Sequence, residues 1–201
     1  MKQEILDRIT ALGGYTGQVT GVSLQADLAA IELKTPLYPK PRDTPWARAE
    51  ETEPIEGLGE YMQEALTGAD TRAVLEHTLD LYFSADAPSG GQAFFRPQLF
   101  TPFRKEASDF AAWTGVISET AVRKMIPADP LDFMQIAWSS GYPDVYFICL
   151  SDKNPDNPTV YSTDHEVFFT EIEEEGNLET FFNSFFTRDE LAVEIRRVVC
   201  K

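Results

Sequence analysis

The chain has 201 residues and a net charge of −16 at neutral pH, and 43% of its residues are hydrophobic, among them fourteen phenylalanines. This length suits one domain that buries roughly 70% of the surface of the unfolded chain, and the composition excludes general disorder. The strong negative charge excludes nucleic acid and anionic membranes as expected partners. We therefore treat residues 1–201 as a single domain.

The ends and the cysteines of the chain indicate a cytoplasmic protein. Four charged residues within the first eight positions leave no apolar stretch of the length that a signal peptide needs. The longest apolar run, residues 145–150, is too short to cross a bilayer. Cys149 and Cys200 form neither a Cys-x-x-Cys pair nor a zinc-site spacing, so we expect no metal and no cofactor.

Residues 1–56 are predicted to be an N-terminal elaboration of this domain. Apolar residues recur at helical spacing over residues 2–13, and two glycines follow, which predicts an amphipathic helix. Residues 19–24 and 31–33 are expected to form short strands. A Pro-rich acidic loop is expected over residues 36–57, because four prolines remove backbone donors and an acidic run follows them.

Two amphipathic helices are predicted next, over residues 58–66 and 74–82, with Asp70 as the cap of the second. His77 lies beside the apolar stripe of the second helix without a second ligand at helical spacing, so we expect a surface residue. Residues 86–104 are rich in Gly, Pro and Phe, but the Gly-Lys-Ser/Thr of a phosphate-binding loop is missing.

From residue 132 the hydrophobic period changes to that of strands. Residues 132–138, a Gly-Tyr-Pro-Asp turn and residues 145–150 predict a hairpin whose second strand, apolar on both faces, is central in its sheet. Residues 159–172 are expected to form two short strands broken near residues 162–164.

Two helices are predicted to end the chain. Asn177 caps a helix over residues 177–187 whose stripe of large apolar residues belongs to the core: Leu178, Phe181, Phe182, Phe185 and Phe186. The last helix starts at Asp189 and is expected to pack on the sheet.

The sequence offers little for catalysis or metal binding. Asp152, Asn154 and Asp156 match the first three positions of a calcium loop, but the required Gly and the final Glu are missing, which favours a polar turn. Within Asp164-His165-Glu166, strand alternation would direct His165 away from the two acids, so the three would not converge on one ion. With two histidines in all and no positioned base, we expect a protein that is not an enzyme.

The C-terminal half resembles a known family. The segments DFMQIAWSSGYPDVYFICLSD, PTVYSTDHEV and NLETFFNSFF, with an acidic link before the last, are similar to the second half of SUKH-superfamily domains over about 55 residues. In place of the family's Leu-Pro opening and Asn-Gly, this chain has EPIEGLGEYMQEALTG at residues 53–68. The superfamily includes fungal cell-wall-synthesis regulators and bacterial immunity proteins that neutralise polymorphic toxins. The resemblance implies an α+β fold, with a mostly antiparallel sheet flanked by helices, that binds another protein in the cytoplasm.

The distribution of charge independently points to a basic protein partner. Residues 126–187 contain twelve acidic residues and one lysine, a net charge of −11. Such a field accelerates encounter with basic proteins, of which a nuclease toxin is one example. Eight acids are expected to form the partner surface: Asp152, Asp156, Asp164, Glu166, Glu171, Glu173, Glu174 and Glu175.

Four interpretations stay open at this point. The first is an immunity-type protein that occludes a toxin, and the second is a regulatory scaffold or interaction module with several cellular partners. The third is a small hydrolase that uses carboxylates from distant segments. In the fourth, the acidic face is only solvated. The sequence says nothing about the oligomeric state.

Overall fold

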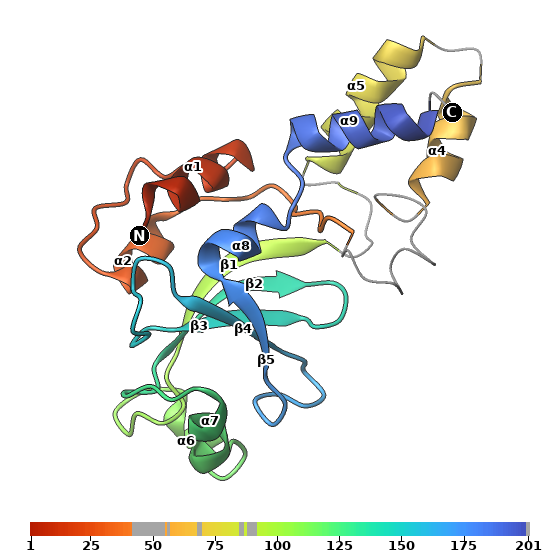
Figure 1. Cartoon of the computed structure of the whole chain (residues 1–201). Coiled ribbons are helices and arrows are strands. Elements are labelled where there is room, and N and C mark those ends of the chain that lie inside the picture. Colours follow the sequence, from red (N-terminus) through yellow and green to blue (C-terminus); the bar gives the residue numbers. More distant parts are fainter. Residues whose placement is uncertain (42–54, 56, 68–69, 85–86, 88–91, 200–201) are drawn as a thin grey trace.

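The computed structural model describes residues 1–41, 55, 57–67, 70–84, 87 and 92–199, and within these ranges it confirms an α+β fold (Figure 1). The helices are α1 (Gln3–Ala11), α2 (Leu24–Ala30), α4 (Leu58–Ala65), α5 (Thr71–Tyr82), α6 (Phe110–Trp113), α7 (Glu119–Met125), α8 (Leu178–Asn183) and α9 (Arg188–Val199). The strands are β1 (Ala93–Phe100), β2 (Phe133–Ser139), β3 (Val145–Cys149), β4 (Thr159–Thr163) and β5 (Glu173–Asn177). No helix of the described ranges is long and apolar enough to cross a membrane.

The five strands form one antiparallel sheet in the order β1-β2-β3-β4-β5. The predicted hairpin is confirmed, since Met134 pairs with Ile148 across β2 and β3. The expectation that β3 is central is confirmed as well, because two strands lie on each side of it. Phe147, Ile148 and Cys149 of this strand are at most 1% exposed. Its continuous apolar run therefore reflects burial on both faces.

The two edge strands were not expected. Strand β1 contains Pro97, which lacks an amide donor. The register with β2 shifts between Phe95 and Gln98, so Pro97 lies in an irregularity of the hydrogen-bond ladder. Of the two strands expected over residues 159–172, the first is confirmed as β4, which ends at Thr163. The second is wrong, because residues 164–172 form a turn and the next strand starts at Glu173. Part of the acidic run is therefore an edge strand.

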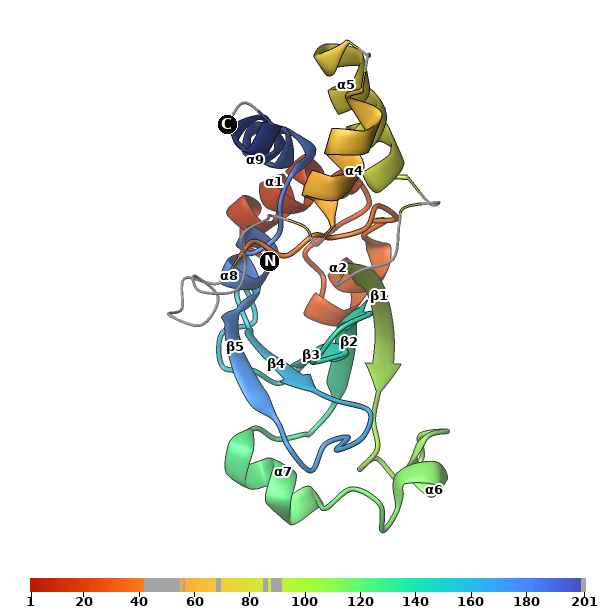
Figure 2. The same cartoon turned by 90° about the vertical axis from the view of Figure 1, so that its right-hand side faces the viewer.

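The upper face of the sheet is covered by α1, α2 and α8 (Figure 2). Ile5, Ile9 and Leu28 are fully buried there, so the N-terminal segment supplies part of the main core. Helix α1 confirms the first predicted helix. The strand expected at residues 19–24 is wrong, because the Ser23 side chain accepts a hydrogen bond from Ala26 N and starts α2. In the expected strand at residues 31–33, only Glu32 forms an isolated bridge, to Tyr15.

Helix α8 begins where the sequence predicted and ends earlier. The Asn177 and Thr180 side chains form a capping box. The helix stops at Asn183 instead of continuing to residue 187, because the Phe186 amide donates to the carbonyl of Tyr38 at 2.8 Å. All five apolar residues of the stripe are nevertheless buried, four around the sheet and Phe186 in a separate cluster.

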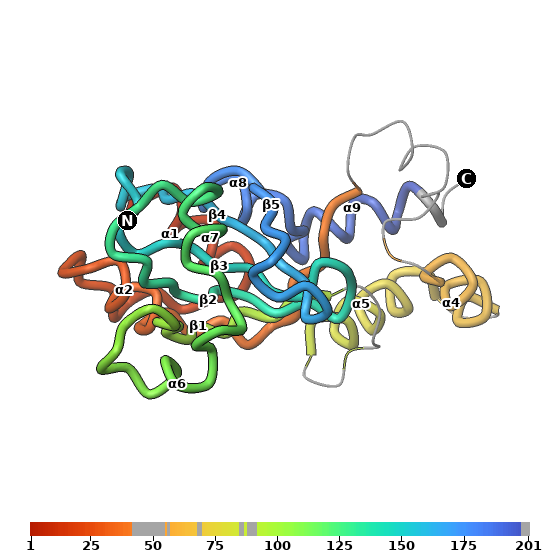
Figure 3. The backbone as a smooth tube through the Cα atoms, turned by 90° about the horizontal axis from the view of Figure 1, so that it is seen from below, coloured from red at the N-terminus to blue at the C-terminus, as the bar shows by residue number. Residues whose placement is uncertain are grey.

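The lower face of the sheet is covered by α6, α7 and the turn of residues 164–172 (Figures 2 and 3). Phe169 of this turn is 2% exposed and stacks on Phe147 with 4.5 Å between the ring centroids. Its backbone φ is 58°, a left-handed conformation that is costly for a side chain of this size. Packing of the ring on the sheet holds the turn in this shape.

Helices α4, α5 and α9 form a second core beside the sheet (Figures 1 and 3). Both helices predicted before residue 83 are confirmed, with Asp70 accepting from Arg72 N and His77 exposed. The expectation that α9 packs on the sheet is wrong: Leu191 and Ile195 are buried against α4 and α5 instead. Most of the predicted Pro-rich acidic loop, residues 42–54 and 56, lies outside the described residues.

Candidate functional site

Seven acids gather around one end of the sheet, and we call this group the acidic face. They come from the β2–β3 turn, the β4–β5 turn and β5. Because β3 and β4 are antiparallel neighbours, the turn before β3 and the turn after β4 lie at the same end of the sheet. The members are Asp144, Asp164, Glu166, Glu171, Glu173, Glu174 and Glu175. Six of the eight predicted surface residues are among them. Asp144 was not predicted, because only the pairing of β3 with β4 brings its turn beside residue 164.

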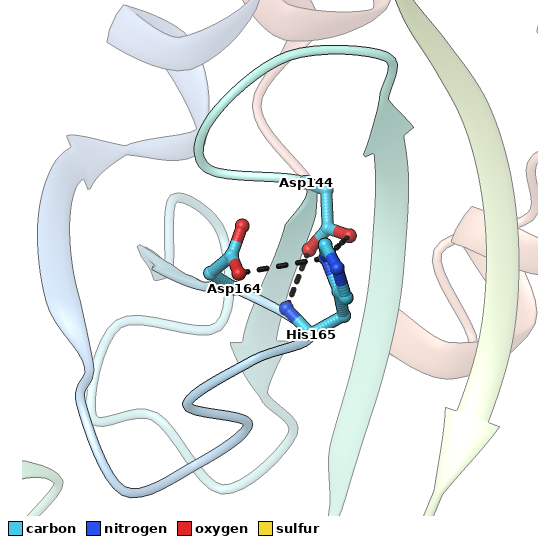
Figure 4. Close-up of side chains that lie close together, drawn as sticks. All are labelled: Asp144, Asp164 and His165. Carbon is cyan, nitrogen blue, oxygen red and sulfur yellow. Dashed lines mark hydrogen bonds and ion pairs between the residues drawn. The ribbon is translucent and has the colours of Figure 1, made fainter.

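A histidine bridges the two turns of this face (Figure 4). His165 Nδ1 lies 2.7 Å from Asp144 Oδ2, and the main-chain amide of His165 donates to Asp144 Oδ1 at 3.0 Å. Its Nδ1 also lies 3.4 Å from Asp164 Oδ1. The hydrogen bond to Asp144, followed by the charge of Asp164, raises the pKa of His165 above its usual value. The bridge is therefore strongest when the imidazole is protonated.

This geometry corrects the strand-alternation argument for Asp164 and His165. The strand ends at Thr163, so the two side chains belong to a turn and are not held on opposite faces. Among the described residues, Asp144, Asp164 and His165 each offer a metal-ligand atom within 4.8 Å of one another. These atoms also fix the turn, since Asp164 Oδ1 accepts from Glu166 N at 2.9 Å. That the chain holds no metal stays a prediction.

Four of the seven carboxylates of the acidic face make no ion pair within the described residues. Glu166, Glu171, Glu173 and Glu174 form neither a salt bridge nor a side-chain hydrogen bond there, although the charge of Glu166 acts on His165. All four are exposed. Glu175 differs, because it accepts from Ser162 Oγ at 2.8 Å. The face therefore presents negative charge that the fold itself does not compensate.

Tyr142 stands out from the β2–β3 turn beside these acids, and 72% of it is exposed. Partial desolvation, and then the charges of Glu173 and Glu171, raise the pKa of its hydroxyl. An exposed tyrosine next to a charged surface is typical of residues that anchor protein interfaces. Its only signal in the sequence is its place in a Gly-Tyr-Pro-Asp turn.

Asp152 and Asp156 lie in the β3–β4 turn, at the opposite end of β4 from Asp164. The Asp152 carboxylate accepts from Asn154 N at 2.7 Å and from Thr159 N at 3.1 Å. Asp156 pairs with the amino group of Met1 at 3.1 Å. These contacts fit the predicted polar turn, although both Asp152 and, from the acidic face, Glu174 act on the hydroxyl of Tyr161.

A comparison of the chain with protein-family models, curated proteins and solved structures found no match. The likeness to SUKH-superfamily domains therefore stays a prediction from the motifs quoted above.

Proposed function

We propose that this chain is a non-catalytic protein-binding domain of the immunity type, which occludes a basic, nuclease-like toxin with its acidic face. The observation that carries the proposal is the set of exposed carboxylates that make no ion pair within the described residues, namely Glu166, Glu171, Glu173 and Glu174. The resemblance to SUKH-superfamily domains supports the immunity role.

The physical basis is electrostatic complementarity. Like charges close together raise the energy of the free fold, and a cation-rich surface that covers them lowers it. Charges of this kind steer the encounter and thereby raise the association rate, most strongly at low ionic strength. The bridge between His165 and Asp144 holds the two turns together before binding, so less conformational entropy is lost on association.

The test compares two double charge reversals of equal size. Glu173→Lys with Glu174→Lys alters the acidic face, whereas Glu60→Lys with Glu64→Lys makes the same change on exposed positions of α4. The binding partner to assay is the product of the reading frame next to the gene for this chain, with surface-capture kinetics at low and high ionic strength.

We expect the first variant to associate on the order of tenfold more slowly at low ionic strength, with a flatter salt dependence, and the second to behave much more like the parent. Equal effects of both variants would mean that only net charge matters. Parental rates for the first variant under both conditions would mean that the acidic face is merely solvated. A partner without toxic activity would favour the alternative, a regulatory interaction module.

A further inference from the structure

A pocket of about 410 Å³ opens on the lower face of the sheet, between strands β1 to β3, α6 and the β4–β5 turn. Five aromatic side chains contribute to its lining: Phe100, Trp113, Phe147, Phe168 and Phe169. They contact one another in series, with ring centroids 4.8 Å apart for Trp113 and Phe168 and 4.5 Å apart for Phe147 and Phe169. Its size is that of a typical ligand site, and aromatic walls with a few polar groups are typical of such sites.

Two glutamine side chains supply polar groups to this pocket. Gln98 and Gln135 are direct partners across β1 and β2, and both line the pocket. Gln135 is half-buried on a face where its neighbours Phe133 and Phe147 are at most 1% exposed. Within the described part of the chain, neither amide group has a side-chain hydrogen bond. Gln98 is exposed, and no buried side-chain nitrogen or oxygen of the described residues lacks a hydrogen-bond partner, so both amides are solvent-accessible groups that a ligand can bond.

The charge of the pocket is negative. Asp109 lines it and accepts hydrogen bonds from Thr101 N at 2.7 Å and Thr101 Oγ1 at 3.1 Å. No lysine, arginine or histidine is among the lining residues, and Asp109 makes no ion pair within the described ranges. The pocket therefore disfavours anions and favours a cation that can also donate hydrogen bonds.

The pocket also borders the acidic face. Val145 of its lining follows Asp144 directly, and Phe168 lies two residues after Glu166. A protein that covers the acidic face therefore lies beside residues that line the pocket. Interfaces commonly combine a pocket that holds an anchor side chain with a charged rim.

We infer that the pocket receives an arginine side chain of the basic partner, an inference that rests on the proposed function. A guanidinium is planar, stacks on aromatic rings, is more weakly hydrated than an ammonium and carries five donors for the oxygens of Gln98, Gln135 and Asp109. A lysine ammonium matches the charge but not the planar shape. A methylated ammonium matches the aromatic walls but leaves the amide oxygens without donors.

The test uses three small probes on the full chain, observed by saturation-transfer NMR: the N-acetyl amides of arginine, citrulline and lysine. Citrulline keeps the planar shape without the charge, and lysine keeps the charge without the plane. We expect the arginine probe to bind on the order of tenfold more tightly than either. Equal binding of citrulline or lysine, or no binding of arginine, would overturn the inference.

Two variants locate the site. Gln135→Leu keeps the volume of the side chain and removes its amide, and we expect it to weaken arginine binding several-fold. The matched control, Gln63→Leu, changes an exposed glutamine of α4 and is expected to bind like the parent. Equal loss in both variants, or none in Gln135→Leu, would contradict the assignment, and the comparison of probes on the parent chain holds even if Gln135→Leu fails to fold.

The two proposals fail separately. The probe experiment needs no partner, and the reversal of Glu173 and Glu174 leaves the pocket lining unchanged. If the partner responds to the charge reversal while the arginine probe does not bind, only the pocket assignment falls. If the arginine probe binds while the partner ignores the charge reversal, only the role of the acidic face falls.

Discussion

Replacing Glu190 by glutamine should weaken the connection between the sheet and the second helical core. The Glu190 carboxylate receives two hydrogen bonds from the Arg8 guanidinium, at 3.0 and 2.8 Å, and lies 3.1 Å from Lys40 Nζ. It also accepts from Thr187 N at 2.9 Å, while Thr187 Oγ1 accepts from Glu190 N, so the pair forms a capping box at the start of α9. One side chain thus joins α1, residue 40 and α9.

The expected magnitude follows from the pKa of this carboxyl group. The hydrogen bond from Arg8, with smaller contributions from Thr187 and Lys40, lowers the pKa of Glu190 from 4.5 to about 2. Taken in full, this difference corresponds to about 3 kcal/mol of folding free energy. Because 38% of the side chain is exposed, solvent screening reduces the value, and we expect Glu190→Gln to lower the free energy of unfolding by about 1–2 kcal/mol at neutral pH.

The pH dependence has a definite sign. A lowered pKa stabilises the folded state above the ordinary pKa of 4.5, and this contribution disappears as the pH falls towards 2. Urea unfolding followed by circular dichroism should therefore show a difference between parent and variant that shrinks over this window. The control is Glu194→Gln, because among the described residues the Glu194 carboxylate pairs only with Arg197 of the same helix. This variant should lower the free energy of unfolding by about 0.5 kcal/mol or less. A Glu190→Gln variant as stable as the parent at neutral pH would refute the reasoning.

Three further predictions concern the core, the histidine bridge and metal content. Phe182 is fully buried against Phe95, so Phe182→Ala should lower the unfolding free energy by about 3–5 kcal/mol in the same urea assay, and a cost below about 1 kcal/mol would contradict its place in the core. NMR titration should give His165 a pKa above 6.5, and this pKa should fall towards 6.5 in the Asp144→Asn variant. The stabilisation from the bridge is present below pH 6.5 and is lost as the pH rises through the pKa of the folded state. An unchanged pKa in the variant would contradict the assignment. Elemental analysis of the dialysed protein should find no stoichiometric zinc or calcium, because the ligand atoms of Asp144, Asp164 and His165 already bond to one another and to the main chain. One retained equivalent of metal would make these three residues a metal site.

Local signals in the sequence were sufficient for much of the fold. The β2–β3 hairpin, the central position of β3 and the burial of the stripe from Leu178 to Phe186 could be predicted because side-chain periodicity reports directly which faces are covered. The helix starts at Asp70 and Asn177 could also be predicted from the sequence, because a capping side chain bonds to backbone amides only two or three residues away.

The edges of the sheet required knowledge of the neighbouring strands. The run Glu173-Glu174-Glu175 has no strand propensity of its own, and it becomes β5 because β4 offers a free edge for hydrogen bonding. The early end of α8 has a similar origin, since the amide of Phe186 bonds to Tyr38, almost 150 residues away in the chain.

By itself, the sequence determined the central hairpin, the capped helices and the concentration of negative charge, all of which depend on composition or on residues close together in the chain. Tertiary structure alone decided which acids lie together: it placed Asp152 and Asp156 at the opposite end of β4 from Asp164 and added Asp144 through the bridge to His165. It also decided that an aromatic pocket lined by two glutamine side chains lies beside the turns that carry this surface. The reason is that antiparallel pairing brings turns from distant segments to the same end of a sheet, and no local pattern in the sequence encodes that proximity.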